Sequence, residues 1–475
     1  MRRTKIIATL GPATEDPAVL ERLIRAGTDV VRVNFSHGDW ADQERSIRLV
    51  REVSERVGRY VAVLADLQGP KIRIRRFADG PVQLAEGDAF FLDSALPRDQ
   101  GTAAGVGVAY EGLHGDLRSG DMLLLDDGKL TLRVEAVNGT RVNCRVLVGG
   151  QLDDNKGINK HGGGLSAPAL TDKDRDDIVH AAAAQVDWLA VSFVRGPNDI
   201  HEARSLLRNA GGTAHLVAKI ERAEAVENLD AVIDASDAVM VARGDLAVET
   251  GYASLTGLQK RIIRRARNRH KVAITATQMM ESMISSKVPT RAEVSDVANA
   301  VMDGTDAVML SAESAVGRNP VRAVEVMADV CVGAEAYRLQ SSRSRRNDEH
   351  FQFVDQAIAM SVMYAANHMD VHAIIALTES GSTALWMSRI RSDIPIFAFT
   401  RHETTLRRVA LYRGVYPVAF DPTSTLGDDL YQSIFSRLLD LGHVREGDLL
   451  IFTKGDMSGV SGGTNSMTIL RVISP

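Results

Sequence analysis

The sequence predicts an α/β fold: a TIM (β/α)8 barrel with an inserted antiparallel β-barrel domain and a C-terminal open α/β domain. Short apolar runs rich in β-branched residues recur along the chain, and amphipathic, helix-like stretches separate most of them. Such runs are typical of parallel strands covered on both faces, and eight of them in β/α units indicate a barrel. The runs cover residues 4–10, 29–35, 61–67, 187–193, 215–221, 237–245, 271–277 and 306–314.

The inserted domain is predicted from the one long break in this series, between the third and fourth runs. The break holds roughly 120 residues, far more than one crossover connection uses. Apolar and polar residues alternate within it, and the turn pairs Asp127-Gly128 and Asn138-Gly139 favour antiparallel hairpins. We therefore expect a barrel domain at 1–67 and 170–340, with an inserted β lid domain at 68–169.

The C-terminal domain is predicted to follow a polar, charged stretch at 341–350 that is typical of a linker. Beyond this stretch, helix-like segments alternate with further apolar runs, as they do in an open and mostly parallel sheet. We expect this third domain to span 341–475.

The composition excludes several classes of protein. The 475 residues carry 56 Lys and Arg against 61 Asp and Glu, a net charge of -5, without the positive field that nucleic acid or an anionic membrane attracts. No apolar run approaches the ~18 residues of a spanning helix, and the first run is too short for a secretory signal. Two widely separated cysteines, Cys144 and Cys331, fit a reducing compartment. We expect a cytoplasmic protein that binds neither nucleic acid nor membrane.

The candidate site lies at the carboxyl ends of the predicted barrel strands, where barrel enzymes carry their chemistry. Lys219 and Glu221 alternate along one strand and therefore point into the same space, and Asp245 follows the next run. A lone Lys-x-Glu is typical of a solvated pair, and Asp245 could also cap a helix. Two carboxylates, a lysine and an arginine at one rim nevertheless indicate a hard divalent cation that bridges an anionic substrate. The polar residues that end the runs are Arg32, Asn34, Ser36, His37, Asp66, Ser192, Lys219, Glu221, Arg243, Gly244, Asp245, Thr277, Gln278, Ser311 and Glu313.

Long motifs that occur in order along the chain resemble the pyruvate kinase family. They are TKIIATLGPA, VRVNFSHG, DLQGPKIR, VAKIERAEA, MVARGDL, ATQMMESM, PTRAEVSDVANA and DGTDAVMLSAE. The sequence is most similar to the bacterial form that lacks an N-terminal extension and has GPKIR after the third strand. The resemblance implies transfer of the phosphoryl group of phosphoenolpyruvate to ADP, which gives pyruvate and ATP in the last step of glycolysis. It also implies a homotetramer.

The resemblance also implies roles for residues at the rim. Glu221 and Asp245 would hold Mg²⁺ or Mn²⁺, and Lys156 would face the nucleotide phosphates. The family's catalytic positions match Lys219, Thr277 and Arg32, and its substrate-binding positions match Arg32, Arg73, Lys219, Gly244, Asp245 and Thr277.

The monovalent-cation site departs from the better-known family pattern. Asn34, Ser36, Asp66 and Leu67 stand at the family's potassium-ligand positions, but Leu67 and Gln68 replace the Thr and Lys of potassium-dependent members, and Lys71 replaces their Glu. An ammonium group held there could supply the charge that K⁺ otherwise brings. We expect activity that does not require K⁺.

An effector site is predicted in the C-terminal domain, where 378–383 follows a strand and opens a helix. Its hydroxyls and free N–H groups could cradle a phosphate, although helix capping is the alternative. The resemblance implies allosteric activation by a phosphorylated metabolite, and the nearby Glu379 favours AMP or a sugar monophosphate over a bisphosphate. The expected effector residues are Thr378, Ser380, Ser382 and Thr383, with Arg401 and Lys454 as charge partners.

Two alternatives remain open at this point. A metal-dependent barrel lyase acting on pyruvate or oxaloacetate would share the carboxylate pair and would not need ADP. A non-catalytic metabolite sensor would keep the third domain and an inert barrel, which the intact Lys219, Glu221, Asp245 and Thr277 argue against.

Overall fold

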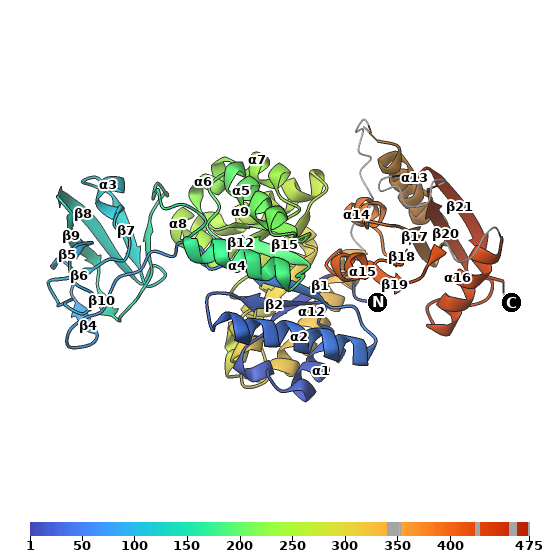
Figure 1. Cartoon of the computed structure of the whole chain (residues 1–475), viewed down its shortest axis with the longest axis horizontal. Helices are drawn as coiled ribbons and strands as arrows, with labels where there is room; N and C mark the ends of the chain where they lie inside the picture. Colours follow the sequence, from blue (N-terminus) through green and yellow to red (C-terminus); the bar gives the residue numbers. More distant parts are fainter. Residues whose placement is uncertain (340–350, 352, 423–427, 456–462, 474–475) are drawn as a thin grey trace.

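The computed structural model places the three parts of the molecule in a row, with the barrel between the insertion and the C-terminal domain (Figure 1). The structure describes residues 1–339, 351, 353–422, 428–455 and 463–473. The linker expected at 341–350, and with it the boundary between the barrel and the C-terminal domain, lies outside the described residues. Within the described part of the chain, each helix is too short or too polar to cross a membrane.

The central part is a closed barrel of eight parallel strands, as the eight apolar runs predict. Most of these strands are buried along their whole length, because helices cover the outside and apolar side chains fill the inside. In spatial order the strands are β1 (Lys5–Thr9), β16 (Ala307–Leu310), β15 (Val272–Ala276), β14 (Ala238–Ala242), β13 (His215–Ile220), β12 (Trp188–Val191), β3 (Ala62–Asp66) and β2 (Val30–Asn34).

The barrel helices begin and end at residues suited to those positions. Thr171 and Thr290 open two helices with capping boxes, in which Asp174 and Glu293 return the hydrogen bond. Gly304 ends the second of these helices with φ 94, a left-handed conformation that favours glycine. The helices are α1 (Pro17–Arg25), α2 (Trp40–Val57), α4 (Asp172–Ala183), α5 (Pro197–Asn209), α6 (Ala223–Glu227), α7 (Leu229–Ala235), α8 (Arg243–Thr250), α9 (Tyr252–Asn268), α10 (Arg291–Asp303), α11 (Ala312–Ala315) and α12 (Pro320–Leu339), with short 3-10 turns η1 (Pro12–Thr14) and η2 (Glu281–Ile284).

The insertion is a mostly antiparallel sheet domain that follows β3, as the alternating sequence predicts. Its six-stranded sheet runs β11-β7-β8-β9-β5-β6, and β4 pairs with β10 in a separate ribbon. The elements are β4 (Val82–Leu84), β5 (Ala89–Asp93), β6 (Gly105–Gly107), α3 (Leu113–Asp116), β7 (Met122–Leu125), β8 (Leu130–Asn138), β9 (Arg141–Val148), β10 (Gly150–Leu152) and β11 (Ile158–Lys160).

The segment 72–78 joins the two outer strands of this sheet and closes it into a barrel. On one side, Ile74 N donates to Lys156 O at 2.9 Å and Ile158 N donates to Ile72 O at 2.9 Å. On the other side, Arg75 N donates to Gly107 O at 2.7 Å. Backbone groups at both edges of the sheet are therefore paired with the same segment.

The C-terminal domain is an open five-stranded sheet in the order β19-β18-β17-β20-β21, in which β21 alone is antiparallel to its neighbour. This arrangement confirms the predicted α/β architecture. The elements are α13 (Val354–His368), β17 (Ala373–Leu377), α14 (Ser382–Arg389), β18 (Ile396–Thr400), α15 (Glu403–Val409), β19 (Val415–Ala419), α16 (Asp428–Asp440), β20 (Leu449–Lys454) and β21 (Ser466–Arg471).

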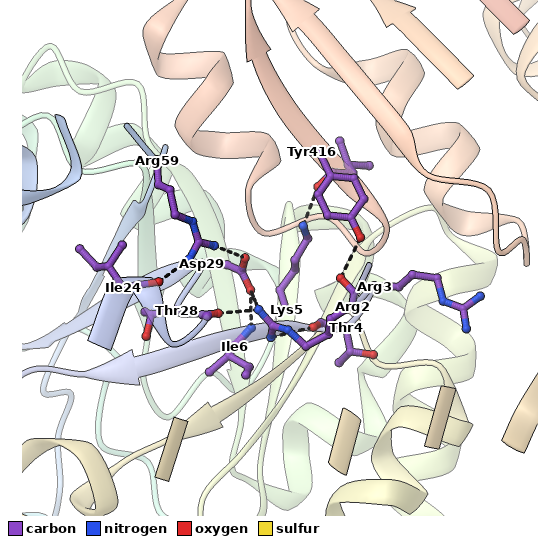
Figure 2. A network of polar contacts seen from close by, with 12 residues as sticks. Arg2, Arg3, Thr4, Lys5, Ile6, Ile24, Thr28, Asp29, Arg59 and Tyr416 are labelled. Atoms are coloured by element: carbon purple, nitrogen blue, oxygen red, sulfur yellow. Dashed lines mark hydrogen bonds and ion pairs between the residues drawn. The ribbon is translucent and has the colours of Figure 1, made fainter. Parts of the chain in front are cut away.

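A buried charge network joins the amino-terminal end of the barrel to the C-terminal domain (Figure 2). Asp29 Oδ2 lies 2.7 Å from the Arg2 guanidinium and accepts the Ile6 N–H at 2.9 Å, and the Arg59 guanidinium lies 3.5 Å from Asp29 Oδ1. Lys5 Nζ donates to the Val415 carbonyl at 2.6 Å. Burial lowers the pKa of Lys5 to about 8. Burial raises the pKa of Asp29, but Arg2 and Lys5 lower it by more, and the carboxylate stays ionised.

We expect Asp29→Asn to destabilise the protein by about 3 kcal/mol, because the buried Arg2 and Lys5 and the partly exposed Arg59 lose their counter-charge. The pKa of Asp29 is lower in the folded than in the unfolded chain, so its contribution is present above about pH 4 and is lost as the pH falls further. Thermal unfolding between pH 3 and 8 measures both effects. The control Glu325→Gln removes an ion pair with Arg322 in which both side chains are about half exposed, and its midpoint should stay near the wild-type value. Equal shifts in the two variants would contradict the prediction.

Candidate active site

The rim cluster is built around Asp66, the last residue of β3. Asp66 is buried, and β2 lies beside it with Asn34 as its register partner. Arg32 Nε donates to Asp66 Oδ2 at 2.6 Å, and Lys219 Nζ lies 3.3 Å from Oδ1. Burial raises the pKa of Asp66, but the charges of Lys219 and Arg32 lower it by more, so the carboxylate is ionised. Asp66 thus orients the two cations expected at the site.

Lys219, near the end of β13, is held from three sides. Its Nζ lies 2.9 Å from Glu221 Oε1 and donates to Ser192 Oγ at 2.7 Å, in addition to the pair with Asp66. Burial lowers the pKa of Lys219, but Asp66 and Glu221 raise it by more. The ammonium therefore stays charged in a buried place, where its field on a nearby anion is strong.

Glu221 and Asp245 face the same space. Glu221 Oε2 accepts the Phe193 N–H at 2.7 Å, and burial and then the charge of Asp245 raise the pKa of Glu221. Among the residues that the structure describes, no three His, Cys, Asp or Glu gather into a metal site. A hard divalent ion is often held by one or two carboxylates and completed by substrate oxygens and water. The two carboxylates fit such an ion.

The turn after β14 carries Gly244 and Asp245 into the rim, and neighbouring groups fix its shape. Thr277 Oγ1 accepts the Gly244 N–H at 2.9 Å and donates to the Ala276 carbonyl at 2.7 Å. Thr277 has φ 66 and Gln278 has φ 52, left-handed conformations that are uncommon for residues other than glycine. Such outliers cluster at functional sites. The conformation of Thr277 directs its hydroxyl toward the Gly244 N–H.

Two side chains at the rim, those of Arg243 and Ser192, have a structural role that the sequence did not reveal. The Arg243 guanidinium donates to both oxygens of Asp296, at 2.7 and 2.6 Å, and to the Thr277 carbonyl at 2.6 Å. The Ser192 hydroxyl donates to the Leu67 carbonyl at 2.7 Å while accepting from Lys219. Their place at strand ends was the only signal in the sequence, and each partner lies in a distant β/α unit.

The expected monovalent-cation residues are adjacent, but Asn34, Asp66 and Leu67 each have an oxygen that is bonded within the chain. Asn34 Oδ1 accepts the Ser36 N–H at 3.1 Å, and Asp66 and the Leu67 carbonyl are engaged as described above. Lys71, at the entry to the insertion, places its Nζ 3.3 Å from Asp245 Oδ1. The lysine thus adds a positive charge to the rim at a predicted divalent-ion ligand.

Arg73 and Lys156 lie in the insertion, where each is bonded to the insertion itself. Arg73 Nη1 donates to the Asn155 carbonyl at 2.9 Å, and Lys156 Nζ lies 2.9 Å from Asp126 Oδ1. The Asp127 carbonyl next to this pair accepts the Tyr252 hydroxyl of α9 at 3.2 Å. Any action of these two cations on a substrate at the rim therefore depends on the position of the insertion.

The expected effector residues form a compact turn between β17 and α14. Gly381 N donates to Thr378 Oγ1 at 2.9 Å, and the Thr383 and Thr464 hydroxyls are 2.6 Å apart. The Ser382 N–H, the first of α14, donates to Ser380 Oγ at 3.4 Å, so the Thr378 and Ser380 hydroxyls accept N–H groups at the start of the helix, as the capping alternative expects. Glu379 contacts His402, and its Oε1 lies 3.6 Å from the Arg401 guanidinium. Lys454 Nζ instead lies 5.7 Å from the centre of the Tyr431 ring.

Comparisons with known proteins agree with this geometry. A family model described as the pyruvate kinase barrel domain matches residues 1–324, and one described as the pyruvate kinase alpha/beta domain matches residues 356–470. The chain is 54% identical over 476 residues to pyruvate kinase II of Salmonella typhimurium, covering 99% of each chain. It is 51% identical over 459 residues to a pyruvate kinase of Haemophilus influenzae, covering 96% of each. It is 43% identical to pyruvate kinase 2 of Synechocystis sp., covering 98% of this chain and 79% of the relative.

Proposed function

The chain belongs to the pyruvate kinase family, and we propose that the cluster around Lys219 is where it transfers the phosphoryl group of phosphoenolpyruvate to ADP, giving pyruvate and ATP. The observation that carries this assignment is the charged Lys219 held between Asp66 and Glu221 at the barrel rim. The family acts in glycolysis and implies a divalent metal cofactor. Neither the lyase nor the sensor alternative finds support in the family matches.

We assign the divalent ion to Glu221 and Asp245 and expect it to be Mg²⁺ or Mn²⁺. When bound, the ion supplies positive charge that draws the anionic substrates together. Arg32 would bind the oxygens of the phosphoryl group, held in position by its bond to Asp66. The backbone N–H groups of the 242–245 turn suit the substrate carboxylate, because this turn is the amino-terminal end of α8.

The residues present account for each change in bonding. The bond from phosphorus to the enol oxygen breaks as a bond to an ADP oxygen forms, and Lys219 stabilises the charge left on the enolate oxygen. The enolate carbon then takes a proton to become the methyl group of pyruvate. The Thr277 hydroxyl both donates and accepts, so it can pass that proton on from water. Closure of the insertion would bring Arg73 and Lys156 toward the phosphates and exclude water.

We also propose a homotetramer in the cytoplasm, with the domain boundaries expected from the sequence. Exposed apolar side chains support further assembly, since Phe353, Val354 and Tyr364 at α13 are all more than half exposed in the single chain.

We expect the rate in a lactate-dehydrogenase-coupled assay to require ADP and a divalent ion. We also expect the rate to be the same, within twofold, in KCl and in tetramethylammonium chloride, because the Lys71 ammonium already lies beside Asp245. Reversing this charge in Lys71→Glu should lower the rate in tetramethylammonium by about tenfold, or about 1.4 kcal/mol, with partial recovery in KCl. A large stimulation of the wild-type enzyme by K⁺ at equal ionic strength would refute K⁺ independence, and turnover without ADP would refute the kinase assignment.

We propose that the turn at 378–383 binds a phosphorylated activator, either AMP or a sugar monophosphate. The expected result is a lower phosphoenolpyruvate concentration at half-maximal rate with AMP or ribose 5-phosphate, and a weaker effect of fructose 1,6-bisphosphate, because Glu379 repels added negative charge. Activation should be lost in the double variant Thr378→Ala and Ser382→Ala and kept in Ser361→Ala, which removes an exposed hydroxyl of α13. Equal activation in both variants would place the effector elsewhere.

A further inference from the structure

Glu249 is a buried carboxylate that the reaction as described does not use. It lies on α8, one turn after Asp245, so the two side chains share a face of the helix. Its side chain is 2% exposed. A buried carboxylate costs stability compared with an apolar side chain of similar size, and burial raises the pKa of Glu249 to about 7. The fold retains the group at a position where packing alone would favour an apolar residue.

The first contact of Glu249 is with the segment after β13, which carries the candidate metal ligand Glu221. Glu249 Oε2 accepts the Ala223 N–H at 3.0 Å, and Ala223 is the first residue of α6, two residues after Glu221. One carboxylate therefore joins the turn that bears Glu221 to the helix that bears Asp245.

The second contact is with the last strand of the insertion. Asn159, on β11, donates its side-chain amide to Glu249 Oε1 at 3.4 Å, and the Gly162 N–H donates to the Glu249 carbonyl at 2.9 Å. Three glycines, at 162–164, follow this strand with φ between 79 and 93, which suits the point where a lid turns. Glu249 thus fixes the strand on the insertion side of the glycines.

A small cavity lies at this junction, between the two connections of the insertion and the barrel. Pro70 and Ile72 line it from the entry connection, Leu165 from the exit connection, and Arg222 and Glu249 from the barrel. The Arg222 guanidinium donates to the Leu165 carbonyl at 2.6 Å and lies 4.0 Å from Glu249 Oε1. Glu249 therefore lies where both connections of the insertion meet the barrel.

We propose that Glu249 is a positioning residue that ties the exit hinge of the insertion to the two divalent-ion carboxylates. This inference rests on the proposed metal role of Glu221 and Asp245. The hydrogen bond to Ala223 sets the distance between the turn that bears Glu221 and the helix that bears Asp245. The hydrogen bond from Asn159 couples the position of the insertion to these two segments. Groups that orient metal ligands in this way change metal affinity by about 10 to 100-fold when removed.

The test is Mn²⁺ binding to the full-length protein without substrates, measured by titration calorimetry, together with amide exchange over 158–165. Glu249→Ala should raise the Mn²⁺ dissociation constant at least about tenfold and speed exchange at the hinge. Glu249→Gln keeps an acceptor for the Ala223 N–H. This variant should raise the Mn²⁺ dissociation constant at least threefold, but less than the alanine variant does. Glu335→Ala is the matched control, because Glu335 is equally buried but accepts hydrogen bonds from Arg3 and Thr4 at the other end of the barrel.

The outcomes separate this inference from the function on which it rests. Wild-type affinity in Glu249→Ala, or in Glu249→Gln if the alanine variant does not fold, together with weak binding in Asp245→Asn, would overturn the role of Glu249 alone. Unchanged affinity in Asp245→Asn would overturn the metal site, and the positioning role would fall with it. An equal loss of affinity in Glu335→Ala would show that general destabilisation, and not positioning, is the cause.

Discussion

Replacing Lys219 by methionine should lower kcat at least about a thousandfold, the scale seen when a cation that meets developing charge in phosphoryl transfer is removed. Lys219 is a buried cation that contacts both Asp66 and Glu221, and it stays charged because these two carboxylates surround it. Methionine keeps an unbranched side chain that is one atom shorter than lysine, but it carries no charge and cannot neutralise an enolate. The coupled assay with saturating phosphoenolpyruvate, ADP and Mg²⁺ measures the loss.

The matched control for this variant is Lys260→Met. Lys260 is also paired with a carboxylate, that of Asp303, but it lies on the outer helix α9 with a half-exposed side chain. Its activity should remain within twofold of the wild type. Lys219→Met leaves the buried Glu221 without its cation and Asp66 with Arg32 alone, so its circular dichroism and melting midpoint must be recorded alongside the rate. If the Lys219→Met variant folds and keeps more than a tenth of the wild-type kcat, Lys219 is not a catalytic residue.

The second large effect is expected for Asp245→Asn and Glu221→Gln, which keep the shape of the proposed metal ligands but remove their charge. Each should weaken Mn²⁺ binding and lower kcat by about a hundredfold at a fixed Mg²⁺ concentration. Excess Mg²⁺ should restore part of the rate, because the lost free energy is mainly that of metal binding. Calorimetry with Mn²⁺ and the Mg²⁺ dependence of the rate measure the two quantities.

Asp303→Asn provides the control for the aspartate, since Asp303 ends α10 and pairs with Lys260 away from the rim. Normal Mn²⁺ affinity in both ligand variants would place the ion elsewhere. A rate that Mg²⁺ does not improve, combined with normal Mn²⁺ affinity, would instead assign Asp245 to binding substrate through its turn.

The sequence was sufficient to predict the barrel, because buried parallel strands appear in a sequence as continuous apolar runs. It was also sufficient to predict which end of the barrel carries the site, because the carboxyl ends of parallel strands meet at one rim. It identified Lys219, Glu221 and Asp245 as neighbours from strand order alone. It could not predict that Arg243 pairs with Asp296 or that Ser192 links Lys219 to Leu67, since these pairs are set by the packing of separate β/α units. The pairing of Lys71 with Asp245 likewise depends on how the insertion leaves the barrel.

Residues 72–78 pair with both outer strands of the insertion's main sheet, and this pairing affects the solubility of the protein. A domain that swings into solvent would ordinarily present the outer strands of its sheet as templates for other chains, which is a common origin of aggregation. Here the segment that enters the insertion pairs with β11 on one side and with the β6 region on the other. Both borders of the main sheet are therefore occupied by the insertion's own segment, and a change in the position of the insertion would not offer them to another chain.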